Sequence, residues 1–175
     1  IVSRFASAYP NITLEVNCEL SKNLLSKAGK QSHDLILALE DNPSKTWSNL
    51  VKTDDLVWVT SADHSIQKAP IVPLIAAAEG CIYRQRATNL LDQIQQPWQI
   101  VYTIPDLGGI QQAIQEGLGV TVLAKSTVPG NLRVLSPSAR FPDLGKVGIS
   151  LLASKRSANN KAVHLLTEFL KTSLT

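Results

Sequence analysis

The residue types that most often carry out chemistry are sparse and isolated in this chain. The three histidines, His33, His64 and His164, stand far apart in the sequence. Neither an HExxH motif nor a cluster of Cys and His with the spacing of metal ligands is present. Isolated histidines are more often surface or core residues than ligands. The sequence therefore predicts no metal site.

The motifs that bind phosphates or activate a serine are also incomplete. The stretch AGKQS at residues 28–32 is similar to the end of a phosphate loop, but Leu24 stands where that loop needs its first glycine. Residues 117–122 lack the third glycine of a dinucleotide fingerprint and follow a helix instead of opening one. No GxSxG motif occurs. A Ser-His-Asp triad built from distant residues stays open at this point, but the sequence favours a protein that is not an enzyme and has no cofactor.

The two cysteines, Cys18 and Cys81, form no CxxC pair and fit a reducing cytoplasm without a disulfide framework. Cys18 alternates with polar residues on the same face as Leu14 and Val16, which predicts a buried thiol. A redox sensor needs an exposed thiol of low pKa with a partner. We therefore favour a structural role for Cys18.

The composition excludes several classes of protein. The chain has 175 residues, of which 44% are apolar and 18% charged, enough for a packed core. Its net charge of +3 comes from scattered basic residues, which is weak support for nucleic-acid binding by this segment. No apolar run approaches the roughly 20 residues of a membrane span. Methionine is absent and Ile1 begins inside an apolar stretch, so we interpret the chain as a piece of a longer protein.

The elements that must position any site alternate between strand and helix. Helical spacing over residues 2–9 is followed by strict alternation over residues 12–18, which predicts a strand with one face toward solvent. A helix capped by Ser21 is expected to run to Gly29, and residues 34–39 are typical of a strand covered on both faces. Further strands are predicted at residues 56–60, 71–78, 98–103, 120–124, 132–135 and 147–153. Further helices are predicted from residue 87 to Pro97, after an Asp106 cap, and around residues 163–170. Such strand–helix–strand repeats predict an α/β fold with parallel sheets, and residues 40–46 and 62–70 are candidate linkers.

Three of these segments, in this order, carry a family resemblance. They are FASAYPNITLEV (residues 5–16), SKNLLSKAGKQSHDLILAL (21–39) and IPDLGGIQQAIQEGLGVTVLAKSTV (104–128). Together they resemble the effector-binding domain of LysR-type transcriptional regulators over almost the whole chain. Two departures concern local turns: Lys30 lies where the family usually has a Gly shortly before the Asp, and Ala124 stands where it often has Pro.

The resemblance implies a fold like that of type 2 periplasmic binding proteins, in which two Rossmann-like α/β lobes are joined by two crossover strands. Lobe I would comprise residues 1–56 and 149–175, and lobe II residues 57–148. The first strand of lobe I and an N-terminal winged helix-turn-helix domain would be absent from this chain. An effector would bind at helix N-termini and strand ends.

The resemblance also implies a set of effector-binding residues. They are Ser21, Lys22, Asn23, Leu39, Glu40, Tyr83, Arg84, Thr103, Ile104, Pro105, Asp106 and Ile149. Ser21 could bind an anionic group or only cap its helix, and Arg84 could pair with a carboxylate or phosphate or lie in solvent. Asp106 is expected to be a helix cap, and its negative charge disfavours an anionic ligand group near the start of that helix.

The function implied is that of a small-molecule-sensing regulatory domain in a bacterial, cytoplasmic transcription factor. The effector is unknown, and the residues named above would allow it to be anionic. The protein would be a homodimer or homotetramer, with residues 12–18 and 21–29 in its interface, and would contact DNA through the absent domain and no membrane. The alternative function is an exported solute-binding protein of a transporter, which shares the fold.

Overall fold

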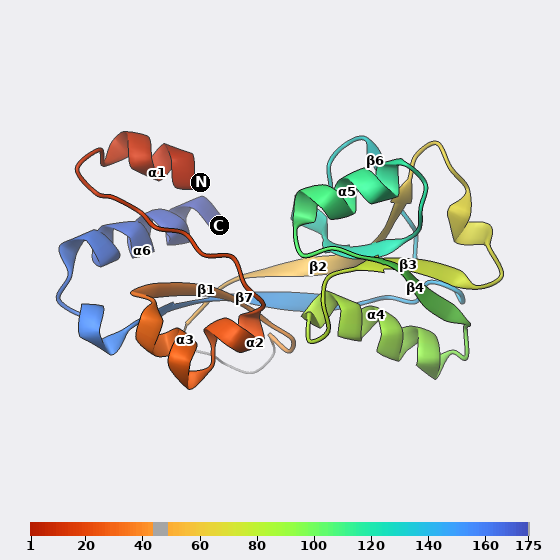
Figure 1. Cartoon of the computed structure of the whole chain (residues 1–175), viewed down its shortest axis with the longest axis horizontal. Coiled ribbons are helices and arrows are strands. Elements are labelled where there is room, and N and C mark those ends of the chain that lie inside the picture. Colours follow the sequence, from red (N-terminus) through yellow and green to blue (C-terminus); the bar gives the residue numbers. More distant parts are fainter. Residues whose placement is uncertain (44–48, 175) are drawn as a thin grey trace. The chain divides into compact units, whose positions relative to one another are not determined.

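The computed structural model describes residues 1–43 and 49–174, which form two compact units. Unit 1 comprises Ile1–Thr53 and Gly148–Thr175, and unit 2 comprises Asp54–Val147. Two strands belong to both units, β2 (Leu50–Ser61) and β7 (Lys146–Ala153), and the chain passes between the units inside them (Figure 1).

Unit 1 is built on a short antiparallel ladder. Strand β1 (Leu35–Glu40) pairs with β7 from Leu35 opposite Ala153 to Glu40 opposite Gly148. Its helices are α1 (Val2–Ala8), α2 (Ser21–Leu24), α3 (Lys27–Ser32), the 3-10 turn η3 (Lys155–Ser157) and α6 (Lys161–Leu174). Fully buried Phe5 of α1 meets Phe169 of α6 edge to face, with ring centroids 5.3 Å apart, so α1 lies against α6 (Figure 1).

Unit 2 contains the parallel pairing that the sequence predicts. Strand β3 (Val72–Ala76) leads through α4 (Ile82–Gln93) to β4 (Trp98–Thr103), and the two strands pair in parallel. Helix α5 (Leu107–Gln115) then leads to β5 (Thr121–Ala124), which pairs antiparallel with β2, as does β6 (Leu132–Val134). The 3-10 turns are η1 (Ile66–Lys68) and η2 (Lys125–Thr127). The core centres on Val59, Ile75, Ile114 and Leu123, all at most 1% exposed.

The strand predicted at residues 12–18 is wrong. The structure places no strand there, although the apolar alternation is present. A strand needs a hydrogen-bonded neighbour, and none of the described strands pairs with these residues. Cys18, predicted to be buried with that strand, is exposed.

The helix predicted from Ser21 to Gly29 is also wrong, because it divides into α2 and α3. Ser26 begins the second helix: its hydroxyl accepts a hydrogen bond from the backbone N–H of Gly29 at 3.1 Å. The two helices pack closely at that point, where a Cβ on Gly29 would lie 2.4 Å from the carbonyl oxygens of Asn23 and Leu24. Only glycine allows this approach.

Three further expectations need correction. Strand β1 is buried on one face only, since Leu37 is 44% exposed. The pairings of β1 with β7 and of β2 with β5 and β6 are antiparallel, whereas β3 pairs in parallel with β4 and forms a parallel bridge from Leu74 to Val120, so the prediction of parallel sheets holds around β3. Residues 62–70 are no linker but lie within unit 2 and include η1. The other predicted linker, residues 40–46, lies partly outside the described residues.

Candidate functional site

The predicted site residues of unit 2 gather at the carboxyl ends of two parallel strands. Ala76, the last residue of β3, pairs with Thr103, the last residue of β4. The backbone N–H of Ile104 continues this pairing by donating to the carbonyl oxygen of Ala76 at 3.1 Å. Helices α4 and α5 follow these two strand ends in the chain. This edge of a parallel sheet is where α/β proteins generally bind ligands.

Arg84 and Tyr83 come from the first turn of α4. One guanidinium nitrogen of Arg84 donates to the carbonyl oxygen of Ala77 at 3.2 Å, which holds the side chain beside the end of β3. Burial, followed by the nearby charges of Cys81 and Asp54, raises the pKa of Tyr83 to about 12. The Tyr83 hydroxyl therefore keeps its proton at neutral pH and is available as a hydrogen-bond donor. Arg84 is partly buried and bound to the backbone, so it is not a fully solvated surface residue.

The connection from β4 to α5 holds the other four residues of this set. Asp106 is the N-cap of α5, as predicted, and its carboxylate accepts from the backbone N–H of Gly109 at 2.8 Å. Ile104 is half-buried and packs against Gly109, leaving no room there for a Cβ. Thr103 and Pro105 are exposed. A hydroxyl and a carboxylate are thus held at the edge where Arg84 also lies.

In unit 1, Ser21 has a different role from the predicted cap. The N-cap position of α2 is Leu20, and it makes no side-chain cap bond. The Ser21 hydroxyl instead accepts a hydrogen bond from the backbone N–H of Leu39 at 2.9 Å, joining α2 to the end of β1. Its own proton stays available for donation. Lys22 and Asn23 follow in the same helix and are exposed.

Glu40 supplies an acceptor that none of the described residues satisfies. Its side chain is 9% exposed, and the buried Oε1 atom has no hydrogen-bond partner among the described residues. The residue ends β1 opposite Gly148, and Leu39 beside it is opposite Ile149. The structure therefore brings Ser21, Leu39, Glu40 and Ile149 together at one end of the β1–β7 ladder.

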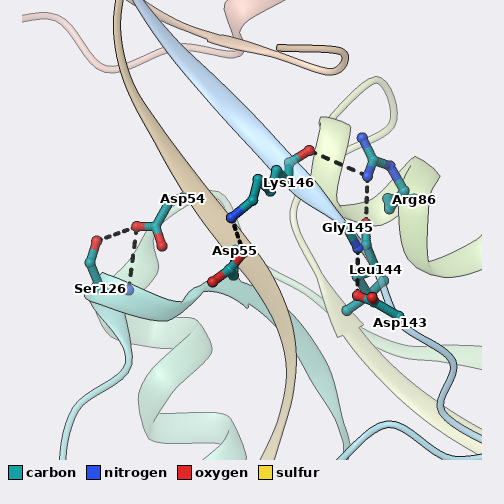
Figure 2. A network of polar contacts seen from close by, with 8 residues as sticks. All are labelled: Asp54, Asp55, Arg86, Ser126, Asp143, Leu144, Gly145 and Lys146. Carbon is teal, nitrogen blue, oxygen red and sulfur yellow. Dashed lines mark hydrogen bonds and ion pairs between the residues drawn. The ribbon is translucent and has the colours of Figure 1, made fainter. Parts of the chain in front are cut away.

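Sequence reasoning missed a polar network at the start of unit 2 (Figure 2). Asp54 is 8% exposed and accepts hydrogen bonds from both the hydroxyl and the backbone N–H of Ser126. The next residue, Asp55, forms an ion pair with Lys146 at 2.5 Å. Arg86 donates to the carbonyl oxygen of Leu144 at 2.5 Å. The signal in the sequence that could have revealed this network is the pair of adjacent acidic residues, Asp54 and Asp55, directly before an apolar strand segment.

No group of three or more His, Cys, Asp or Glu side chains in the part of the chain that the structure describes could hold a metal ion. Within the same residues, no helix is both long enough and apolar enough to cross a bilayer.

A family model and a curated relative both match this sequence. The model of the LysR substrate binding domain matches residues 1–175. The HTH-type transcriptional regulator PecT of Dickeya dadantii (strain 3937) is 26% identical over 144 residues, which cover 82% of this chain and 45% of PecT. The chain thus spans less than half the length of that relative.

Solved structures of similar domains share the fold. The regulatory domain of CcmR from Synechocystis PCC6803, in complex with 2-PG, superposes with a TM-score of 0.71 at 18% identity and covers 99% of this chain and 89% of its own. The apo regulatory domain of HypT from Salmonella typhimurium gives a TM-score of 0.73 at 12% identity, covering 99% of this chain and 90% of its own. The α/β fold is that of these regulatory domains.

Proposed function

Because the chain belongs to the family of LysR substrate-binding domains, we propose that it is the effector-sensing part of a bacterial transcriptional regulator. The observation that carries this proposal is the match of the family model over residues 1–175. The similarity to PecT and to two regulatory domains favours a regulator over an exported solute-binding protein. A ligand would change the activity of the regulator by preferring one arrangement of the protein over another.

We propose unit 1 as lobe I and unit 2 as lobe II, each with its own set of effector-contacting residues. The set in unit 1 offers a hydroxyl proton on Ser21 and an unsatisfied acceptor on Glu40. The set in unit 2 offers donors on Arg84 and Tyr83 and the hydroxyl of Thr103. A ligand group that suits the set in unit 1 carries a hydrogen-bond donor for Glu40, and one that suits the set in unit 2 carries an acceptor or an anionic group for Arg84.

A thermal-shift screen tests this proposal. A metabolite panel that includes 2-PG, the ligand of the CcmR domain, should contain a compound that raises the melting temperature of the chain, because a ligand of the native state stabilises it. Ser21→Ala, Arg84→Lys and Thr103→Val should each reduce that shift. The matched controls Ser136→Ala, Arg4→Lys and Thr13→Val change exposed residues outside both sets and should leave it unchanged. If the ligand-induced rise in melting temperature is unchanged in all three test variants, neither proposed set of residues contacts the effector.

The remaining partners follow from the family. We propose that the protein acts in the cytoplasm as a homodimer or homotetramer and contacts DNA through a separate N-terminal domain. The basic residues of this chain are scattered along the sequence, and the net charge is only +3. The 175-residue chain should therefore bind DNA weakly and without sequence preference, as an electrophoretic mobility assay at physiological salt can measure. Tight binding to one operator would contradict this assignment.

A further inference from the structure

One cavity of unit 1 lies away from the proposed effector-contacting residues. Its volume is about 450 Å³, within the range of sites that hold small molecules. Among its lining residues are Lys30, His33, Ile36, Leu152, Lys155 and Arg156. Ile36 is four residues before Glu40 in β1, which places the two roughly 13 Å apart along the strand. The cavity therefore lies toward the other end of the β1–β7 ladder from Ser21 and Glu40.

The charged side chains around this cavity all have the same sign. Lys30 of α3 and Lys155 and Arg156 of η3 line it, and among the described residues no acidic side chain does. The ammonium groups of Lys30 and Lys155 have no hydrogen-bond or ion-pair partner among the described residues. Like charges around one hollow repel each other, and a bound anion would relieve that repulsion. The cavity thus has the charge of an anion site.

The guanidinium of Arg156 is held in place by contacts of a single nitrogen. Its Nη2 atom donates to the carbonyl oxygen of Ser32 at 3.2 Å and lies 3.4 Å from Oδ1 of Asp34. That carboxylate also accepts a hydrogen bond from the hydroxyl of Ser157 at 2.6 Å. The N–H groups on Nη1 and Nε of Arg156 therefore have no partner among the described residues. A guanidinium that is already positioned and keeps free N–H groups suits the recognition of a phosphate or a carboxylate.

The cavity also has an oriented ring and an apolar surface. Nδ1 of His33 lies 2.9 Å from the carbonyl oxygen of Gly29, and because a carbonyl oxygen only accepts, this nitrogen carries the proton. The bond fixes the ring of His33 at the end of α3. Ile36 and Leu152 are opposite each other in the β1–β7 ladder, so they lie on the same face of it and offer apolar contact. An apolar surface with a few convergent polar groups is typical of sites for small molecules.

We propose that this cavity is a second ligand site, which takes a small phosphorylated molecule with an apolar part. A phosphate group carries about two negative charges at neutral pH and three strong acceptor oxygens, so one group can bind Lys30, Lys155 and Arg156 together. The apolar part would cover Ile36 and Leu152. A cavity of this volume holds one small molecule, whereas a DNA duplex would contact only its rim. The site is separate from the effector-contacting residues, so its failure would leave the proposed function untouched.

Titration of the isotope-labelled chain with phenyl phosphate, followed by amide chemical shifts, tests the site. The amide signals of Gln31, His33 and residues 154–156 should move, and those of Ser21 and Glu40 should not. Inorganic phosphate should move the same signals but bind about fivefold more weakly, because it lacks the apolar part. Phenol, which lacks the anion, should move none of them. Unmoved signals with phenyl phosphate, or equal movement with phenol, would overturn the proposal.

Neutral variants of the two lysines give a second readout. Lys30→Gln and Lys155→Gln should each weaken the binding of phenyl phosphate by about threefold or more, because each removes one exposed charge partner. The matched controls are Lys27→Gln in α3 and Lys161→Gln in α6, which change exposed lysines outside the lining and should leave binding unchanged. Equal weakening by controls and test variants would contradict the proposal, since net charge alone would then attract the anion. A short DNA duplex that moves the same amide signals at lower concentration than phenyl phosphate would also overturn it, because the site would then be a nucleic-acid contact.

Discussion

Replacing Ser126 by alanine should destabilise unit 2 through the buried carboxylate of Asp54. Ser126 donates to one oxygen of that carboxylate twice, from its hydroxyl and from its backbone N–H, the latter at 3.3 Å (Figure 2). Asp54 is 8% exposed, so little water can replace a lost donor. Ser126→Ala removes the hydroxyl and leaves the longer backbone bond.

The size of the effect follows from the charge on the acceptor. A hydrogen bond to a charged group contributes about 1.5–3 kcal/mol, and an acceptor left buried without its donor adds to the loss. Because the backbone N–H of Ser126 stays, we expect a loss of about 2 kcal/mol in the free energy of unfolding. For a chain of this size that corresponds to a fall of roughly 4–8 °C in melting temperature.

Thermal unfolding followed by circular dichroism, with urea titration as a check, measures this loss. Ser136→Ala is the matched control, since Ser136 is an exposed serine of the same unit. In an Asp54→Asn background the same bond is neutral, so Ser126→Ala should cost only about 1 kcal/mol. An equal loss in the Asp and Asn backgrounds would refute the role of the buried charge, as would a loss no larger than that of Ser136→Ala.

Three other changes have defined outcomes. Gly29→Ala should cost roughly 1–3 kcal/mol, because its Cβ would lie 2.4 Å from two carbonyl oxygens, while Gly130→Ala, with nothing within 4 Å, should be neutral in urea titrations. The hydrogen bond and charge of Lys146 lower the pKa of Asp55 below 3.8, so the ion pair stabilises the native state above that pH and is lost as the pH falls through the folded pKa. The difference in melting temperature between Lys146→Ala and the unchanged chain should therefore shrink below about pH 4. The pKa of Tyr83 is raised to about 12 from 10.0, so stability should fall between these pH values, and Tyr83→Phe should remove the late phase of an absorbance titration at high pH.

Unit 2 could be predicted well because its signals are local. The strand at Trp98–Thr103 and the Asp106 cap lie in short segments whose structure depends on nearby residues. The family resemblance from three ordered motifs is confirmed by the family model. The contact between Asp54 and Ser126 joins residues 72 positions apart, and no periodicity in the sequence reports such a pairing.

Unit 1 was harder to predict from the sequence because its helices and strands depend on partners outside their own segment. Residues 12–18 have the alternation of a strand, but alternation indicates only which faces would be buried, and pairing decides whether a strand forms. The division of α2 from α3 depends on a close approach at Gly29 that side-chain spacing does not reveal. The unsatisfied oxygen of Glu40 depends on burial by residues far away in the sequence, including Gly148.

The chain order of the two units has a consequence for synthesis. Unit 2 is one continuous stretch, Asp54–Val147, so all of it has been synthesised before β7 is complete. Unit 1 needs Gly148–Thr175, because β1 pairs with β7 and Phe5 packs on Phe169. The first 53 residues must therefore wait for the last 28, with apolar surface uncovered meanwhile. Folding during translation should proceed from the middle of the chain outward, and the N-terminal unit should be the one that depends most on chaperones.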